Sequence, residues 1–390
     1  MQNRINKTIL LAFLVMVGTA VEAQDKQNMF NPVNTSVTSL MIAPDARAGG
    51  MGDVGAATEA DVYSQYWNPA KYPFNVARAG VGISYTPWLR KLVNDINLAN
   101  LAGFYRIGDY SAVQASLRFF SLGEVFLTDM DDMTVNPYEF AFDVGYSRML
   151  SERFSMAVNM RFIYSDIKYD YTAESSAGKA FAADIAMYRL GYFMMGNREC
   201  SFGWGLNISN IGSKISFGGD DNSEFIPTNM RLGINMTIPF NEYNKFSIAA
   251  DANKMLVPTY PKQETDESDN DYTDRVQKDY YDISPIAGIF KSFGDAPNGF
   301  KEELEEIQWS VGCEYTYNDR FMLRGGYHHE AANKGNRKYF TVGAGFHMSV
   351  FTIDAGYVFS TSGTNALDQT MRFSLAFDLD GMKDLFGRRR

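Results

Sequence analysis

The stretch that determines the fold class runs from Phe154 to Tyr164 and reads FSMAVNMRFIY. Every second residue in it is apolar, and the residues between are small or polar except Ile163. A period of two places apolar side chains on one face of a β-strand and polar side chains on the other. The same alternation recurs at residues 230–238, 307–317 and 371–377. The chain is therefore predicted to be rich in amphipathic strands.

The length of these alternating runs favours a membrane protein over a soluble sandwich, which alternates too. Many runs reach the roughly 9–11 residues that a tilted strand needs to cross a bilayer. Beyond the N-terminal region the sequence contains no continuous apolar run long enough for a membrane-spanning helix. Because only helices and closed barrels satisfy their backbone in lipid, we predict an all-β outer-membrane barrel.

The N-terminus carries the features of a secretory signal peptide. Arg4 and Lys7 precede an apolar stretch from Ile9 to Val17, and a zone of small residues ends at Ala23. Cleavage is expected after Ala23, which makes residues 1–23 the signal peptide. Export together with the predicted barrel indicates the outer membrane as the destination.

Composition narrows the classes of function. The chain has 390 residues, of which 45% are hydrophobic and 14% aromatic, and a net charge of -10. The acidic balance argues against nucleic acid as a partner, since phosphate binding needs a basic surface. Cys200 and Cys313 share parity with apolar neighbours on separate strands, so we interpret both as apolar filler rather than as a disulfide.

Short and long connections alternate along the chain, as the two ends of a transmembrane barrel require. Residues 24–76 show little alternation, so we predict an irregular N-terminal segment, then a barrel over 77–380 and a periplasmic tail at 381–390. The stretch from Ile283 to Phe290 could be a short strand, but that would give an odd number of strands. Taken as loop, it makes residues 257–306 one long extracellular excursion and keeps an even count of about fourteen strands. The last part of that excursion favours a helix because apolar residues recur among glutamates.

Two stretches of the N-terminal segment stand out. Residues 45–53 read DARAGGMGD, and residues 67–70 read WNPA. They resemble the entry motif of FadL-like outer-membrane proteins, whose N-terminal segment packs into a fourteen-stranded barrel as a hatch. Glycine suits a close backbone approach to a barrel wall, and Asn-Pro suits a fixed turn. The resemblance implies hatch residues at Asp45, Arg47, Gly49, Gly50, Gly52, Asp53, Trp67, Asn68 and Pro69.

Later blocks of sequence are closer to one branch of that family. They lie at residues 121–124, 284–293, 295–300, 324–327 and 371–375. They resemble PorV (also called LptO) of the type IX secretion system, with the sister barrel PorQ as an alternative. The resemblance implies a secretion component without a cofactor. Its implied partners are C-terminal signal domains of secreted cargo, a giant translocon barrel, a sortase attachment complex and outer-membrane lipids.

The long excursion is the candidate partner-binding loop. Its acidic and aromatic side chains suit docking to a protein, while a solvated acidic loop and a calcium site are the alternatives. The acidic spacing lacks the glycine and the terminal glutamate of an EF-hand loop. The candidate contact residues are Asp266, Glu267, Asp269, Asp271, Tyr272, Phe290, Phe293 and Phe300.

Two rival functions fit the same barrel. A FadL-like transporter of hydrophobic small molecules needs a lumenal ligand and an open path. A lipopolysaccharide deacylase needs a serine within reach of a histidine, and His329 near Ser360 or Ser362 is the candidate pair. We expect no catalytic residues, because the chain has no G-x-S-x-G elbow and His329 is better explained as a histidine of the membrane interface. We expect no metal site, because the three histidines do not converge in the predicted topology.

Overall fold

A computed structural model gives the fold. It describes residues 30–90, 93, 95–127, 133–167, 176–218, 222–263, 266–360 and 367–381. The predicted signal peptide, residues 1–23, and the predicted tail beyond residue 381 lie outside the described residues. No helix in the described part of the chain is long and apolar enough to span a membrane.

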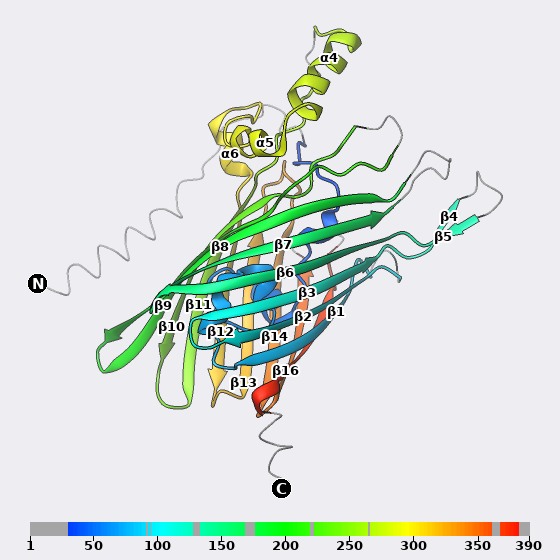
Figure 1. The fold of residues 1–390 in the computed structure, drawn as a ribbon. Coiled ribbons are helices and arrows are strands. Elements are labelled where there is room, and N and C mark those ends of the chain that lie inside the picture. Colours follow the sequence, from blue (N-terminus) through cyan, green and yellow to red (C-terminus); the bar gives the residue numbers. More distant parts are fainter. Residues whose placement is uncertain are drawn as a thin grey trace, which may run out of the picture.

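Fourteen antiparallel strands close into a barrel, in which the first strand pairs with the last (Figure 1). This confirms the predicted fold class and strand count. A two-stranded sheet of β4 (Val125–Leu127) and β5 (Met133–Val135) stands apart from it. The barrel strands are β1 (Ala79–Pro87), β2 (Asn97–Ile107), β3 (Ser111–Ser121), β6 (Tyr138–Ser151), β7 (Phe154–Asp166), β8 (Gly178–Met195), β9 (Arg198–Gly212), β10 (Asn229–Pro239), β11 (Asn244–Met255), β12 (Gln308–Tyr317), β13 (Phe321–His329), β14 (Lys338–Met348), β15 (Phe351–Ser360) and β16 (Met371–Asp378).

In β7 the alternating sequence places apolar side chains on the lipid side and polar side chains on the lumen side. Val158 and Met160 face outward and are 54% and 72% exposed, whereas Asn159 and Arg161 are buried inside the barrel. The inward Arg161 is held by Asp143 and Asp184 of the neighbouring strands. Polar residues thus line the interior because they pair with one another there.

The two ends of the barrel differ in the length of their connections. At one end the turns are tight, and Gly196 and Asn197 alone join β8 to β9. Positive φ angles at Gly108, Gly196 and Asn318 allow three of these turns. Long connections lie at the opposite end, which we assign to the outer side because barrels carry their long loops there.

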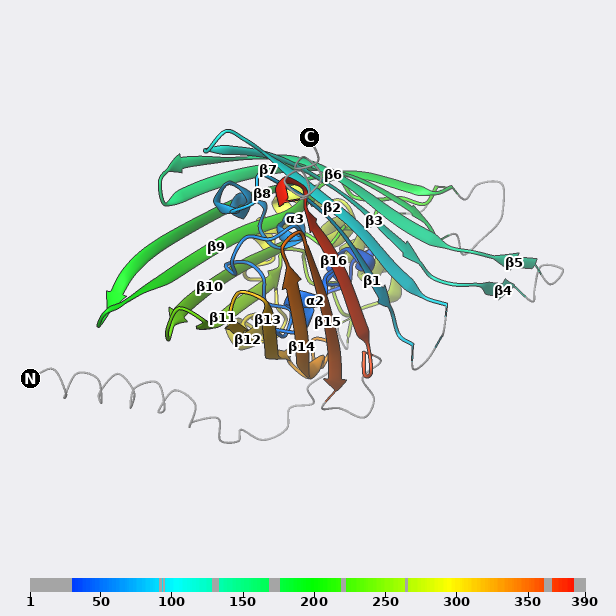
Figure 2. The same cartoon turned by 90° about the horizontal axis from the view of Figure 1, so that it is seen from below.

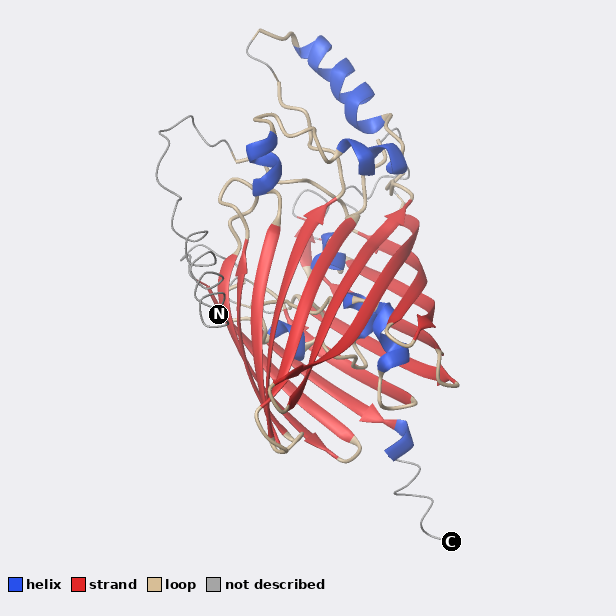
Figure 3. Ribbon diagram, turned by 90° about the vertical axis from the view of Figure 1, so that its left-hand side faces the viewer, coloured by secondary structure: helices blue, strands red, loops and turns tan. Residues whose placement is uncertain are grey.

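The longest connection forms a helical cap over the outer end, as Figures 1 and 3 show. We call residues 256–263 and 266–307 the outer cap. It contains α4 (Asp269–Val276), the π-helix η3 (Gln277–Tyr281), α5 (Pro285–Lys291) and α6 (Phe300–Glu305). Residues 285–291 are therefore helix rather than strand, which is why the strand count stays even.

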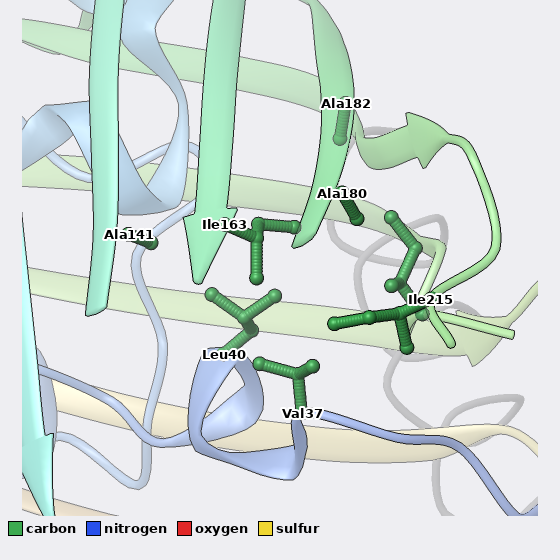
Figure 4. Packing of buried hydrophobic residues seen from close by; sticks show 8 residues of the cluster. Val37, Leu40, Ala141, Ile163, Ala180, Ala182 and Ile215 are labelled. Atoms are coloured by element: carbon green, nitrogen blue, oxygen red, sulfur yellow. The ribbon is translucent and has the colours of Figure 1, made fainter. Parts of the chain in front are cut away.

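The N-terminal segment, residues 30–76, lies within the ring of strands in the view along the barrel (Figure 2). It contains the 3-10 helix η1 (Thr38–Met41), α2 (Ala46–Gly49), α3 (Ser64–Trp67) and the 3-10 helix η2 (Pro69–Phe74). Figure 4 shows how Leu40 of η1 and the preceding Val37 pack toward Ile163 on the inner wall. Apolar side chains thus fix part of this segment to β7 and β8.

Candidate functional site

The polar chemistry of the molecule concentrates in the lumen and beneath the outer cap. In the lumen, Asp45 caps α2 by accepting from Ala48 N–H at 2.9 Å. Its other carboxylate oxygen accepts from Trp67 Nε1 at 2.6 Å, which joins the two entry-motif stretches. Burial raises the pKa of Asp45 to about 6. The two hydrogen-bond donors therefore offset the cost of burying this carboxylate.

Arg47 connects the N-terminal segment to the wall. Its Nη2 lies 3.0 Å from Glu314 Oε1 on β12, and its Nη1 lies 3.0 Å from Asp61. Glu314 also accepts from Arg324 Nε at 2.5 Å, and Arg324 pairs with Asp354 at 2.6 Å. The chain of charges ties α2 to three strands.

Asp53, which follows α2 in the sequence, makes a second connection to the wall. It pairs with Arg372 of β16 and accepts from Tyr339 Oη at 2.5 Å. Burial opposes ionisation of Asp53, but the guanidinium of Arg372 prevails and lowers the pKa of this carboxyl. Asp53 is thus held ionised inside the barrel.

The entry-motif glycines lie against the wall where a side chain does not fit. A Cβ on Gly50 would lie 2.9 Å from Gly343 Cα, and one on Gly52 would lie 2.7 Å from Tyr327 N. Gly52 also has a φ of 75° and donates its N–H to Thr341 Oγ1 at 2.7 Å. A Cβ on Gly49 would likewise lie 2.4 Å from Arg372 Nη1. Close approach therefore explains all three predicted glycines.

Asn68 and Pro69 begin η2, with the Asn68 side chain accepting from Ala70 N–H at 3.0 Å. The Asn68 amide donates to Met187 O of β8 at 2.9 Å. Lys71 follows, fully buried, and donates to Gly55 O at 2.8 Å. Burial lowers the pKa of Lys71 to about 8. The structure thus brings all nine entry-motif residues into the lumen.

Tyr66 is a lumenal residue that the sequence analysis missed. The Cζ atoms of Arg118 and Arg231 lie 4.6 and 5.1 Å from the centre of its ring. Both arginines are buried. Arg118 lies on β3 and Arg231 on β10, and nothing in the sequence pointed to the aromatic ring with which they interact.

Two cavities adjoin the N-terminal segment, one toward the outer end of the barrel and one toward the inner end. The outer one, of about 530 Å³, is lined by Tyr66, Trp88 and Phe120 among others. The inner one, of about 540 Å³, is lined by Asp61, Phe104 and other residues. Among the described residues, none lines both.

The first described residues of the chain reach the outer cap. We call residues 30–36 the N-terminal strap. Asn31 N–H donates to Asn333 O at 2.7 Å, and the Asn31 amide donates to Glu302 Oε1 at 3.0 Å. Tyr280 Oη donates to Asn34 O at 3.3 Å. The strap thus joins the lumenal segment to the cap.

The cap is anchored by buried charges, which we call the cap ion cluster: Lys254, Lys334, Glu302, Glu303 and Glu306. Lys254 Nζ lies 3.0 Å from Glu303 and 2.5 Å from Glu306. Lys334 Nζ lies 2.6 Å from Glu302 and 3.0 Å from Glu306. Both lysines come from outside the cap, so these pairs tie α6 to the barrel rim.

The orientation of α6 is the reverse of what its amphipathic pattern predicts. Glu302 and Glu303 are 2% and 7% exposed, whereas Phe300 and Leu304 are 77% and 52% exposed. The glutamates face inward because their partners are Lys254 and Lys334, which the sequence pattern does not reveal. An amphipathic helix normally buries its apolar side.

The remaining candidate contact residues differ in exposure and in their local contacts. Phe290 and Phe293 are exposed, at 74% and 51%. Several acidic candidates make local contacts instead: Glu267 pairs with Arg275 at 2.6 Å, and Asp271 accepts from Ser268 N-terminal to α4. The others are exposed Asp266, Asp269, which accepts from Gln263, and Tyr272, which donates to Pro261 O.

The structure pairs a serine and a histidine, but not the predicted ones. Ser310 Oγ lies 2.9 Å from His328 Nδ1, and Ser310 is 1% exposed. Its hydroxyl is therefore inaccessible to a substrate in this structure. His329 instead stacks on Trp309 with ring centres 4.9 Å apart, and Ser362 lies outside the described residues. Within the described ranges no three metal-binding side chains converge.

Comparison with known proteins agrees with this architecture. The sequence model of the family described as type IX secretion system protein PorV matches residues 23–262. No curated protein sequence matches the chain.

Among solved structures, the fold is similar to the TodX deltaS2S3 mutant, a monoaromatic hydrocarbon channel. The TM-score is 0.50 at 10% identity, over 85% of this chain and 98% of that chain. The Pseudomonas putida toluene transporter TodX gives a TM-score of 0.47 at 10% identity, over 90% of this chain and 99% of that chain. The first likeness supports the FadL-like barrel fold. The family match covers more than half of the chain, so this outer-membrane barrel belongs to the family of the type IX secretion system protein PorV.

Proposed function

We propose that the protein binds the C-terminal signal domain of secreted cargo on its outer cap and carries it from the translocon barrel to the sortase attachment complex. The observation that carries this proposal is the inverted helix α6, with its charges buried and Phe300 and Leu304 presented outward. Exposed apolar side chains outside the membrane are typical of a protein-binding surface.

The cap supports this proposal because its own contacts hold it in place without a partner. Phe225, Val257 and Tyr280 form a buried apolar cluster beneath it. The cap ion cluster fixes α6, and Thr259 N–H donates to Asp295 at 2.8 Å. Preorganisation lowers the entropic cost of binding. Phe290 and Phe300 are thus held outward on an ordered support.

The lumen supports docking rather than a pore. We propose that residues 30–76 act as a plug, because Arg47, Asp53 and Asn68 each bond to a different part of the wall. The separate linings of the two cavities agree with this role. Breaking such buried pairs is costly, so the plug is expected to stay in place.

Transport of a hydrophobic small molecule is the second candidate function. The outer cavity favours it, since Trp88, Ile96, Phe120 and Leu122 form an apolar side to a space of about 530 Å³. Pockets of this size and lining accommodate small apolar ligands. This function requires the plug to open a path.

Binding of the purified, full-length barrel in mild detergent to an isolated cargo signal domain tests the proposal. We expect a complex with cargo that carries the domain and none with the same cargo lacking it. Absence of a complex, together with uptake of a labelled hydrocarbon into vesicles containing the barrel, would favour the transport function.

A further inference from the structure

The hairpin of β8 and β9 extends beyond the start of the neighbouring strand β7. β7 begins at Phe154, which pairs with Arg189 of β8, yet β8 continues to Met195 opposite Arg198 of β9. We call residues 191–195 the overhang. The last backbone bond on its β7 side runs from Leu190 N–H to Arg153 O. Figures 1 and 2 show the β8–β9 hairpin projecting beyond the adjacent hairpins.

The overhang has an open hydrogen-bonding edge. Backbone groups of successive residues in an antiparallel strand point to opposite sides. Because Leu190 bonds toward β7, Tyr192 and Met194 direct their N–H and C=O groups to that same, now vacant, side. Phe193 faces β9 instead, opposite Cys200.

The side chains of the overhang do not protect this edge. Residues 191–195 read GYFMM, without a charge or a proline. Tyr192 and Met194 on one face are 54% and 64% exposed, and Phe193 and Met195 on the other are 40% and 42% exposed. Native edge strands in water are usually blunted by charges, prolines or bulges. Open sheet edges do not occur in lipid either. Whether the edge faces water or lipid, we therefore expect it to pair with another strand.

The charged residues around the edge have a small positive excess, with Arg153, Arg189 and Arg198 against Glu152 and Glu199, the last opposite Met194. An open groove of about 640 Å³ at the foot of the overhang is lined by Arg153, Phe154, Arg189 and Trp204, together with Ser151 and Glu152. Arg198 lies at the hairpin tip, over the ring of Phe240. None of these three arginines forms an ion pair with a described carboxylate.

We propose that the overhang is a docking edge for an extended, acidic segment of another protein, which adds as a strand beside β8. The backbone groups of Tyr192 and Met194 would pair with it, and acidic side chains would reach Arg153 and Arg189. A second copy of the chain fits less well, because it would bring the same arginines face to face. This site lies at the short-turn end and is independent of cargo binding at the cap.

Amide hydrogen exchange of the full-length barrel in mild detergent tests this proposal. The probe is a synthetic peptide in which valine and glutamate alternate, and its matched control alternates valine and lysine. We expect the glutamate peptide to slow exchange at Tyr192 and Met194 by about tenfold or more, while Phe193, bonded to β9, does not change.

Two variants distinguish the contribution of backbone hydrogen bonds at the edge from that of the nearby arginines. Met194→Pro removes one edge donor, which an edge strand tolerates, and is expected to abolish protection. Arg189→Gln is expected to weaken protection while the barrel keeps its thermal transition. Equal protection by both peptides, protection by neither, or a self-association that itself protects Tyr192 and Met194 would overturn the proposal.

Discussion

Lys334 Nζ lies 2.6 Å from Glu302 Oε1, and both side chains are almost fully buried beneath the outer cap. This pair orients α6, because a helix that commits its glutamates to the barrel rim must present Phe300 and Leu304 outward. The apolar surface that we propose receives cargo is therefore exposed because buried ion pairs hold the opposite side of α6.

Replacing Lys334 by Met tests this relationship. The change leaves Glu302 without its cation, and breaking a buried pair in this way costs about 3–5 kcal/mol. We expect faster protease cleavage within the cap while the barrel stays folded. Lys301→Met on the exposed side of the same helix is the matched control and is expected to have no effect. Equal cleavage of both variants would contradict the role of the pair.

Acidification should loosen the same attachment. Burial opposes ionisation of Glu302, but hydrogen bonds from Lys334 and Asn31 prevail and lower its pKa to about 2, from an ordinary value of 4.5. A depressed pKa contributes stability above pH 4.5 that is lost as the pH falls toward 2. Burial raises the pKa of Asp295 from its ordinary value of 3.8, so this group acts with the opposite sign above that pH.

Amide exchange of α6 between pH 7 and pH 3 measures this dependence after correction for intrinsic rates. We expect opening of α6 to increase on acidification, and Lys334→Met to flatten the profile. A wild-type profile that is already flat would show that Glu302 does not hold the helix.

The contact of Gly52 with the wall predicts a second pair of variants. Gly52 and Gly108 both have positive φ angles, at which an L-residue costs about 1–2 kcal/mol. A Cβ on Gly52 would also strike the backbone of Tyr327, whereas one on Gly108 meets nothing within 4 Å. We expect Gly52→Ala to displace the plug and raise ion conductance in planar bilayers. Gly108→Ala should leave conductance unchanged, and equal conductance of the two variants would argue against the plug.

The barrel could be predicted from the sequence because its determinants are local. Alternation in residues such as Val158 to Met160 reports which side faces lipid, and tight turns such as Gly196-Asn197 mark strand ends. The entry motif located the lumenal residues only through resemblance, since no periodicity pointed to the contact between Asp45 and Trp67.

The cap and the hairpin edge could not be predicted in the same way. The orientation of α6 depends on Lys254 and Lys334, which belong to other parts of the chain, so its own pattern predicted the reverse. The open edge of β8 depends on where β7 begins relative to it, which is a matter of register rather than composition.

The most direct test of the proposed function is the affinity of the full-length barrel for an isolated cargo signal domain. We would compare wild type with Phe290→Ser and Phe300→Ser, and with Phe126→Ser on the separate β4–β5 hairpin, where the side chain is 69% exposed. Loss of an interface anchor of this kind weakens binding about tenfold or more. We predict that loss for the two cap variants and wild-type affinity for the Phe126 variant. Wild-type affinity of both cap variants would contradict the assignment of cargo capture to this surface.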